Sequence, residues 1–298
     1  MTADTQTPTA LTVTPQAPAR HGEPLVGHGE LFFVEGYEID ASSHRWRVGL
    51  PDISREVTVS VVIPALNEEG NLPHVLTSLP PNLHEVVLVD GRSTDATVDV
   101  ARRVHPSIVV VEQEGSGKGD ALRTGFAHCT GDIIVMLDAD GSMAPGEIPR
   151  FVAALLRGAD YVKGSRFLSG GGSADLTAMR NLGNWALRAF GNVMFGTRYT
   201  DLCYGYNAFW RRCLPVVIPD CEGFEVETLM NVRAHTGRLR VAEVPSYEAE
   251  RISGESKLRT WSDGYRVLRT IVRERPRRPM PGAVADVGFA PVVRSRAA

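Results

Sequence analysis

The sequence predicts an α/β protein in which helices cover both faces of a mostly parallel central sheet. Apolar runs rich in Val and Ile alternate four times with helical segments between residues 57 and 158. Each run is continuously apolar, which is typical of strands that a parallel sheet buries on both faces. Polar residues follow three of the runs, at the edge where open parallel sheets bind ligands. The sequence therefore predicts a binding cleft at the carboxyl ends of the strands.

The four strand–helix units follow one another without a break. The first is VTVSVVIP, which ends at Pro64, with the helix NLPHVLTSL and Asn71 as its expected cap. The second is EVVLVD, followed by STDATVDVARRV, where Ser93, Thr94 or Asp95 is the expected cap. The third and fourth are SIVVVE with GDALRTGFAHC, and DIIVMLDAD with EIPRFVAALLRG. All four units therefore belong to one sheet.

These units lie in the middle of three expected regions. Residues 1–55 form an N-terminal extension that is rich in Thr, Pro and Ala at its start, and that start is expected to be disordered. Residues 56–258 form the α/β domain, and residues 259–298 form a basic amphipathic helix and a disordered tail. The composition, 43% hydrophobic and 22% charged, is that of an ordinary globular protein.

The tail helix is expected in WSDGYRVLRTIVRERPRR, where Trp261, Tyr265, Leu268 and Val272 lie near one helical face. From Arg251 onward the chain has eleven Lys and Arg against four Asp and Glu, although its net charge is -3. A basic amphipathic helix suits an anionic membrane surface. A helix packed on the domain with one solvated side stays open as the alternative.

Several classes are excluded. The four cysteines show neither a CxxC pair nor zinc-like spacing with histidines, so neither a metal cage nor a disulfide framework is expected. The N-terminus lacks the basic start and apolar core of a secretory signal, and no apolar run reaches the roughly 18 residues of a membrane span. We therefore expect a cytoplasmic protein whose membrane contact, at the inner face, is peripheral.

The stretch IIVMLDADGS places Asp138 and Asp140 one residue apart after a strand. Side chains at i and i+2 of a strand share one face, so both carboxylates are expected in one cleft. Two bare carboxylates repel each other, and a positive group between them would remove the repulsion. Dinucleotide folds would require GxGxxG after the first strand, which is absent. EGSGKGD lacks the first glycine and the Ser or Thr of a phosphate loop, and the GxGTR loop of nucleotidyltransferases is also absent.

Five motifs occur in order: VVIPALNEEGNL, VLVDGRSTDATVDVA, GKGDALRTGF, GDIIVMLDADGS and VKGSR. Together they resemble the family 2 glycosyltransferases with the GT-A fold, most closely the branch of dolichyl-phosphate mannose synthase and the polyprenyl-phosphate sugar transferases. The resemblance runs from about Val59 to Leu258. It implies a nucleotide-sugar donor and Mg or Mn as cofactor, held against the donor diphosphate by a DxD pair.

The resemblance also implies roles for single residues. Asp140 is the first choice for metal ligation and catalysis, Asp138 binds the metal or the ribose, and Ser142 holds a position that often completes the metal site. In the nucleotide site, Ala65 replaces a frequent Tyr, and Gly91-Arg92 departs from the commoner Asp-Gly, so uracil and guanine both stay open. The implied nucleotide site comprises Pro64, Ala65, Asn67, Glu68, Asp90, Lys118, Asp138 and Ala139.

The acceptor decides the rest of the chemistry. Arg166, Arg251 and Lys257 match basic positions of the family, Arg180 in MRNLGN is a further candidate, and arginine suits phosphate oxygens. A hydroxyl acceptor would require a general base, for which Glu225 and Glu227 are candidates. A lipid phosphate is already anionic and needs no strong base. YTDLCYGYNAFWRR resembles a motif of the lipid-phosphate branch, with Asn207 in place of its usual Arg.

The sequence thus predicts an inverting, metal-dependent glycosyltransferase that moves a sugar from a UDP- or GDP-sugar to polyprenyl or dolichyl phosphate. Two alternatives stay open: a transferase acting on a soluble hydroxyl acceptor, and a catalytically silent sugar-nucleotide-binding protein. The expected partners are the donor and a lipid-phosphate acceptor at the membrane surface, and no nucleic acid. A membrane partner protein and a homodimer stay open as further partners.

Overall fold

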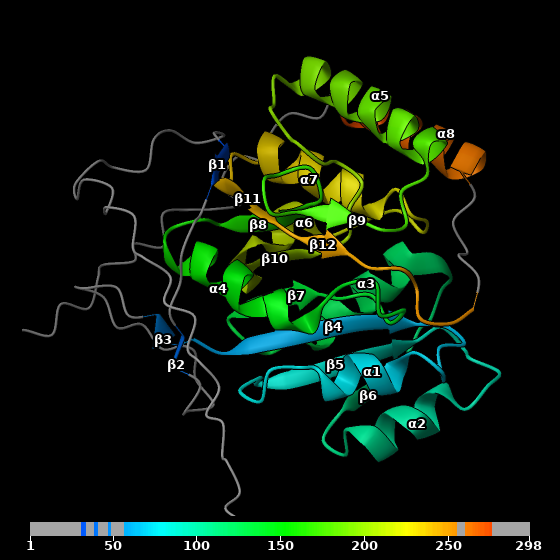
Figure 1. Cartoon of the computed structure of the whole chain (residues 1–298). Coiled ribbons are helices and arrows are strands. Elements are labelled where there is room, and N and C mark those ends of the chain that lie inside the picture. Colours follow the sequence, from blue (N-terminus) through cyan, green and yellow to red (C-terminus); the bar gives the residue numbers. More distant parts are fainter. Residues whose placement is uncertain (1–30, 34–38, 41–46, 49–56, 255–259, 276–298) are drawn as a thin grey trace, which may run out of the picture.

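The computed structural model describes residues 31–33, 39–40, 47–48, 57–254 and 260–275. Its centre is one eight-stranded sheet, to which the later chain contributes strands between the earlier ones (Figure 1). In spatial order the strands are β1 (Leu31–Phe33), β11 (Val241–Pro245), β8 (Tyr161–Ser165), β10 (Asn207–Trp210), β7 (Ile133–Met136), β4 (Val59–Ala65), β5 (Glu85–Asp90) and β6 (Val109–Glu112).

The sheet is mostly parallel, as predicted. β7, β4, β5 and β6 pair parallel to one another, and so do β8, β11 and β1. β10 alone runs antiparallel, between β7 and β8. Two short pairs lie outside this sheet, β2 (Ile39–Asp40) with β3 (Arg47–Val48) and β9 (Gly172–Ser173) with β12 (Tyr247–Glu248).

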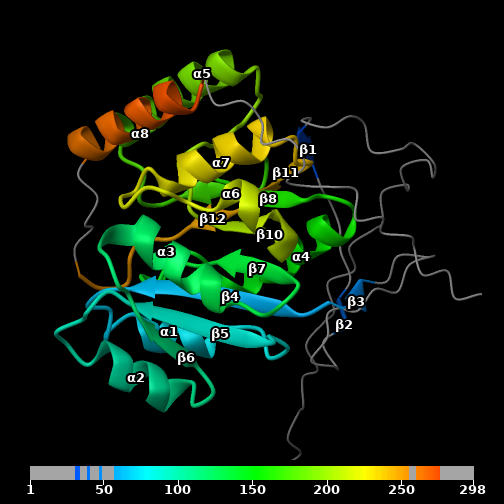
Figure 2. The same ribbon diagram turned by 180° about the vertical axis from the view of Figure 1, so that it is seen from behind.

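Helices cover both faces of the sheet, which agrees with the continuously apolar strands. One face carries α1 (Leu72–Thr77), α2 (Thr97–Val104) and α4 (Ile148–Leu156), and the other carries α3 (Gly117–His128), α6 (Leu214–Val217) and α7 (Val226–Thr236) (Figures 1 and 2). In β4, Val61, Val62 and Ile63 are fully buried, although successive side chains point to opposite faces. The strand is therefore covered from both sides.

An outer layer of two helices lies beyond α7. It consists of α5 (Ala178–Phe195) and α8 (Thr260–Glu274), which pack against each other and against α7 (Figures 1 and 2). Among the residues that the structure describes, no helix combines the length and the apolarity required to cross a membrane. Helix α8 lies in the segment where the sequence predicts an amphipathic helix.

One predicted helix cap is wrong, and another is correct in position but not in its hydrogen bond. Helix α2 begins at Thr97 with Ala96 in the cap position, and Asp95 accepts a hydrogen bond from the Thr97 N–H at 3.0 Å. Asn71 does hold the cap position of α1, but its side chain makes no cap hydrogen bond. Its amide instead donates to Glu68 at 2.5 Å and to the Ser253 carbonyl at 3.2 Å. The contact with Ser253, which is distant in the sequence, therefore replaces the cap hydrogen bond that the Asn71 side chain was expected to make.

Candidate active site

A cleft of about 800 Å³ opens at the carboxyl ends of β4, β5 and β7, where the sequence predicts a binding site. Asn67 and Asp90 lie beside it without lining it: Asn67 accepts a hydrogen bond from the Thr94 N–H, and Asp90 accepts one from the Ser93 N–H. Lys257 falls outside the described residues. The other predicted residues, Glu225 apart, line the cleft together: Pro64, Ala65, Glu68, Lys118, Asp138, Ala139, Asp140, Ser142, Arg166, Arg180, Glu227 and Arg251.

Asp138 and Asp140 lie in a turn rather than on a strand, because β7 ends at Met136. Gly141 allows this turn with a φ of +80°, a conformation that favours glycine. The Ser142 N–H donates to Asp140 Oδ1 at 3.0 Å. The expectation that strand alternation brings the two carboxylates together is therefore wrong in its mechanism, although both line the cleft.

Lys118 lies between two acidic side chains. Its Nζ is 2.7 Å from Asp138 Oδ1 and 2.7 Å from Glu227 Oε1, and all three side chains are largely buried. Burial alone would lower the pKa of Lys118, but the two carboxylates overcome that effect and raise its pKa above the usual value. Burial raises the pKa of Asp138 and Glu227 despite the lysine. Lys118 therefore stays charged and holds two acids that desolvation disfavours.

Arg251 bridges two other carboxylates that line the cleft. Its guanidinium donates to Glu68 and, at 3.4 Å, to Asp140 Oδ2, while its Nε donates to the Ser253 carbonyl at 2.7 Å. Each acid of the DxD pair thus has a basic partner from a different part of the chain. Sequence spacing does not reveal these pairings.

Arg166 is held by acids that the sequence analysis did not identify. It makes a two-pronged ion pair with Asp201, at 2.7 and 3.0 Å, and a third contact to Glu248 at 3.0 Å. Its guanidinium also stacks on the Tyr204 ring at 4.9 Å. Arg180 is paired with Asp175 at 2.6 Å. In this structure the donors of Arg166 therefore serve the protein itself.

The acidic residue Glu250 also lines the cleft and was not identified from the sequence. Glu68, Asp138, Asp140 and Glu227 each contact Lys118 or Arg251, as described above. Asp175 and Glu248 contact Arg180 and Arg166 of the cleft, and Asp263 contacts Arg266 of α8. Among the described residues that line the cleft, only Glu250 is a carboxylate without a Lys or Arg partner.

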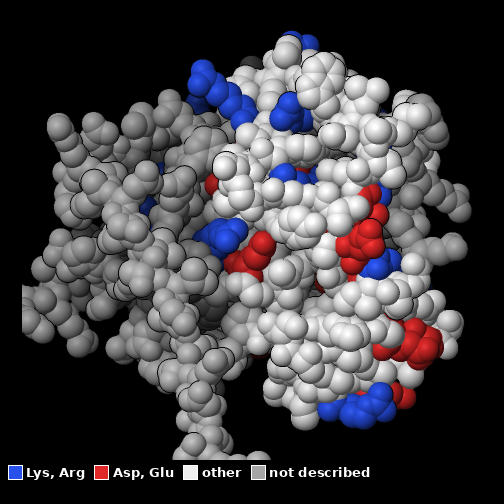
Figure 3. All heavy atoms as spheres, in the orientation of Figure 1, with Lys and Arg blue, Asp and Glu red and all other residues white. Residues whose placement is uncertain are grey.

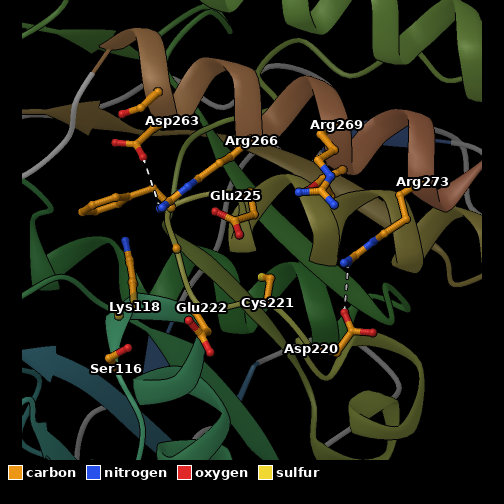
Figure 4. Close-up of a pocket in the computed structure, with 15 residues that line it drawn as sticks. Ser116, Lys118, Asp220, Cys221, Glu222, Glu225, Asp263, Arg266, Arg269 and Arg273 are labelled. Carbon is orange, nitrogen blue, oxygen red and sulfur yellow. Dashed lines mark hydrogen bonds and ion pairs between the residues drawn. The ribbon is translucent and has the colours of Figure 1, made fainter.

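Glu225 lines a second pocket, of about 710 Å³, which adjoins the cleft at Lys118 (Figure 4). Here α8 turns Arg266, Arg269 and Arg273 toward the segment of residues 220–225 (Figure 4). Arg266 contacts Asp263 at 3.6 Å, and Arg273 contacts Asp220 at 3.2 Å. The two glutamates considered as general bases therefore face different cavities.

The donor set of the cleft suits a divalent cation only in part. The described residues contain no group of three or more His, Cys, Asp or Glu side chains able to hold a metal ion. Mg²⁺ in sites for phosphorylated substrates is usually bound through one or two carboxylates, with substrate phosphates and water as the other ligands. Asp140 fits such an ion when a diphosphate supplies further oxygens, and Asp138 lies beside it with both its oxygens in contact with Lys118.

Comparisons with known sequences agree with this site. The model of the family described as "Glycosyl transferase family 2" matches residues 60–227. An uncharacterised glycosyltransferase of Mycobacterium tuberculosis is 46% identical over 108 residues, 36% of this chain and 48% of the relative, so the chain spans about half the length of that curated relative. An undecaprenyl-phosphate mannosyltransferase of Micrococcus luteus is 33% identical over 212 residues, 67% of this chain and 87% of the relative.

A solved structure shares the fold. It is glucosyl-3-phosphoglycerate synthase from Mycobacterium tuberculosis in complex with Mn²⁺, UDP-glucose and phosphoglyceric acid. The TM-score is 0.60 at 26% sequence identity, and the match covers 76% of this chain and 82% of that chain. That protein thus binds a nucleotide sugar and a metal ion on a related arrangement of strands and helices.

Proposed function

Because the chain belongs to glycosyltransferase family 2, we propose that it transfers a hexosyl group from a UDP- or GDP-sugar to a polyprenyl or dolichyl phosphate. Open parallel sheets bind ligands at the carboxyl ends of their strands, and the position of the cleft there supports a donor bound in it. An acceptor phosphate oxygen forms the new bond to the anomeric carbon as the bond to the nucleoside diphosphate breaks. Attack from the face opposite the leaving group inverts the anomeric centre.

The charge of the cleft supports this donor. Asp138 and Asp140 would hold Mg²⁺ or Mn²⁺ together with the diphosphate, and Ser142 lines the cleft beside them. The bound ion would stabilise the charge that grows on the leaving diphosphate. Arg251 and Arg180 supply forked donors in the same cleft, and such donors suit phosphate oxygens.

The single observation that carries the choice of acceptor is the state of Glu227. A hydroxyl acceptor would require a general base free to take its proton. Glu227 is 4% exposed, and its Oε1 lies 2.7 Å from the Lys118 ammonium, while Glu225 faces the neighbouring pocket. An acceptor that is already anionic requires neither carboxylate. The relative that acts on undecaprenyl phosphate supports the same choice.

The outer helices support access to a lipid. Met179, Leu182, Trp185 and Val193 of α5 are exposed, and Leu182 and Val193 are 64% and 83% exposed. The surface over α5 in Figure 3 is largely uncharged and has basic rather than acidic side chains at the top of the view. Tyr265, Leu268 and Val272 are exposed on α8. Residues of α5 and α8 also line the cleft.

We therefore propose that this two-helix layer lies on the inner face of the cytoplasmic membrane. The exposed apolar side chains would enter the boundary between headgroups and acyl chains. The acids of α8, Asp263 and Glu274, are buried, and its three arginines turn toward the neighbouring pocket, so the exposed outer side of the helix is mainly apolar. A lipid phosphate lying in that surface would then reach the adjoining cleft.

The acceptor test is a transfer assay followed by extraction. The protein is incubated with Mn²⁺ and radiolabelled UDP- and GDP-sugars, with and without polyprenyl phosphate. We expect nucleoside diphosphate release to depend on the lipid and the labelled sugar to enter the organic phase. Label only in water-soluble product would refute the lipid acceptor and favour a hydroxyl acceptor, for which Glu250 would be the base to test. Donor binding without nucleoside diphosphate release would favour the silent binding protein.

A further inference from the structure

We propose that Arg251 is an internal counter-ion: it occupies Asp140 in the ligand-free protein and moves to the diphosphate when donor binds. Metal and nucleotide would then bind cooperatively. The inference rests on the proposed function, since it concerns the same donor site. It assigns to Arg251 a role before substrate arrives, beyond the phosphate contact that the family resemblance implies.

Each oxygen of the Asp140 carboxylate has a partner within the protein. Oδ1 accepts the hydrogen bond from the Ser142 N–H at 3.0 Å, and Oδ2 faces Arg251 Nη1 at 3.4 Å. The Arg251 side chain is only 19% exposed, so water screens this charge pair less than a surface pair. The carboxylate charge that a divalent cation would seek at Oδ2 is therefore already neutralised by the Arg251 guanidinium.

The segment that carries Arg251 contacts the residues that follow β7 and the residues that follow β4. The Ile252 N–H donates to the Asp140 carbonyl at 3.3 Å, and a Cβ on Gly141 would lie 2.4 Å from the Ile252 side chain. After β4, Ser253 donates to the Asn71 side chain at 2.7 Å, and a Cβ on Gly70 would lie 2.9 Å from Ser253 Oγ. Both glycines thus make room for the docked segment.

Glu68 holds Arg251 directly, and Asn71 supports this contact. Asn71 contacts both Glu68 and the Ser253 carbonyl, and Glu68 accepts from Arg251. Glu68 therefore acts as a positioning residue in the ligand-free state. The pair with Asp140 is the longer of the two ion pairs of Arg251, so it is the one that a competing ligand can break.

Lys118 and Arg251 differ in how easily each can leave its carboxylate partners. Its Nζ contacts Asp138 and Glu227 at 2.7 Å each, and its side chain is 11% exposed. Displacing it would leave two buried carboxylates without a partner, which is costly. Arg251 can release Asp140, where the cation would bind, while it stays paired with Glu68. The diphosphate offers Arg251 oxygens that its forked donors suit, so nucleotide binding favours the metal and, by linkage, the metal favours nucleotide.

The experiment measures Mn²⁺ binding rather than turnover. Free Mn²⁺ is followed by its electron paramagnetic resonance signal as MnCl₂ is titrated into the full chain, alone and with saturating UDP or GDP. The variants are Arg251→Gln, which removes the charge, and Arg251→Lys, which keeps it. Arg240→Gln is the matched control, because Arg240 pairs with Asp160 at 3.0 Å, outside the residues that line the cleft.

We expect wild-type protein to bind Mn²⁺ about tenfold more tightly with nucleotide than without it, within the usual range of coupled sites. Arg251→Gln should bind Mn²⁺ alone about tenfold more tightly than wild type and should lose most of the enhancement by nucleotide. Arg251→Lys should stay within about threefold of wild type, which separates charge from side-chain shape. Arg240→Gln should behave as wild type.

Equal Mn²⁺ affinity of Arg251→Gln and wild type without nucleotide would overturn the proposal and leave the proposed function standing. The same holds if wild type binds Mn²⁺ equally well with and without nucleotide. If no variant binds Mn²⁺ even with UDP or GDP present, the metal-dependent function fails, and the counter-ion role fails with it.

Discussion

Lys118 is the residue on which the charge balance of the cleft depends most. It comes from the amino end of α3, yet its two partners follow β7 and lie in α7. Gly117 and Gly119 on either side allow close backbone approach, since a Cβ on either would lie 2.1 Å from a carbonyl oxygen of Glu222 or Cys221. The GKG motif is therefore a packing feature as well as a charge.

Replacing Lys118 by Met should destabilise the protein by about 3 kcal/mol, because two buried carboxylates lose their common partner. The measurement is the urea midpoint of unfolding at pH 7, at unchanged slope. Adding Glu227→Gln to Lys118→Met should recover part of the loss, because one of the unpaired charges is removed. A Lys118→Met protein as stable as wild type would show that the lysine is not needed to hold the acids.

Asp140→Ala should lower metal-dependent nucleoside diphosphate release by about 100-fold or more, because the leaving diphosphate loses its main anchor for the cation. The fold should survive, since the change removes a charge from a turn rather than volume from the core. Asp99→Ala on the exposed side of α2 is the control and should keep wild-type release. Unchanged turnover of Asp140→Ala would refute its role at the metal.

At the scale of elements, α3 packs unusually close to the sheet. A Cβ on Gly125 would lie 2.4 Å from Val62 and 2.9 Å from Val89, which belong to β4 and β5. The helix can therefore approach the two strands only with glycine at this position.

Gly125→Ala should consequently destabilise the protein by about 1–3 kcal/mol, the usual cost of overpacking a core. Gly183→Ala is the matched control, because nothing lies within 4 Å of its Cβ position in the exposed α5. Better helix propensity should make that variant slightly more stable. Equal urea midpoints for both variants would show that α3 can shift without cost.

Asp160, which directly precedes β8, makes a contribution to the stability of the fold that depends on pH. Burial alone would raise its pKa, but hydrogen bonds from Arg240 and the charge of Arg212 overcome this and lower it below the usual 3.8. A lowered pKa stabilises the folded state above the unfolded value near 3.8, and this contribution is lost as pH falls through the folded value.

Asp160→Asn should therefore be about 1 kcal/mol less stable than wild type at pH 7. The gap should close as pH falls through the lowered pKa of the folded wild-type carboxyl, because that carboxyl then also becomes neutral. Thermal unfolding at a series of pH values measures this gap. A gap that stays constant down to the lowest pH would mean that the charge of Asp160 contributes nothing.

The sequence reveals elements better than contacts. The continuous apolar runs correctly predict β4 to β7, because a strand that is buried on both faces requires apolar residues at consecutive positions. The strand ends likewise predict where the cleft lies. The partners of Arg166 and Arg251 are not predictable, since Arg251 and Glu68 are 183 residues apart and only the folded topology joins them. The sequence also does not predict that one face of α5 is exposed, because apolar residues such as Met, Leu, Trp and Val predict a buried helix as readily.

At the scale of the whole molecule, α5 and α8 give the protein one apolar end and the outer strand β6 lies at the other (Figure 1). Eight large hydrophobic side chains on these two helices are more than a third exposed: Met179, Leu182, Trp185, Phe190, Val193, Tyr265, Leu268 and Val272. Large exposed apolar patches mark interaction sites more often than chance.

Leu182→Asp combined with Val193→Asp should lower binding to anionic phospholipid vesicles by more than about tenfold, since each buried Leu or Val side chain contributes about 1.5–3 kcal/mol. Vesicle sedimentation measures the bound fraction. Val109→Asp is the control, because Val109 is an exposed hydrophobic residue on β6. Equal binding of the double variant and the control would assign the face to a protein partner or a second copy.

The ion pairs of Arg251 also indicate the order in which parts of the protein fold. Arg251 reaches back 183 residues to Glu68 and 111 residues to Asp140. Contacts so distant along the chain form late, because long loops must close first. A nascent chain on the ribosome would complete β4 to β7 well before residues 248–253 emerge. Closure of the donor site by Arg251 is therefore among the last events of folding, and fragments that stop short of it lack that wall.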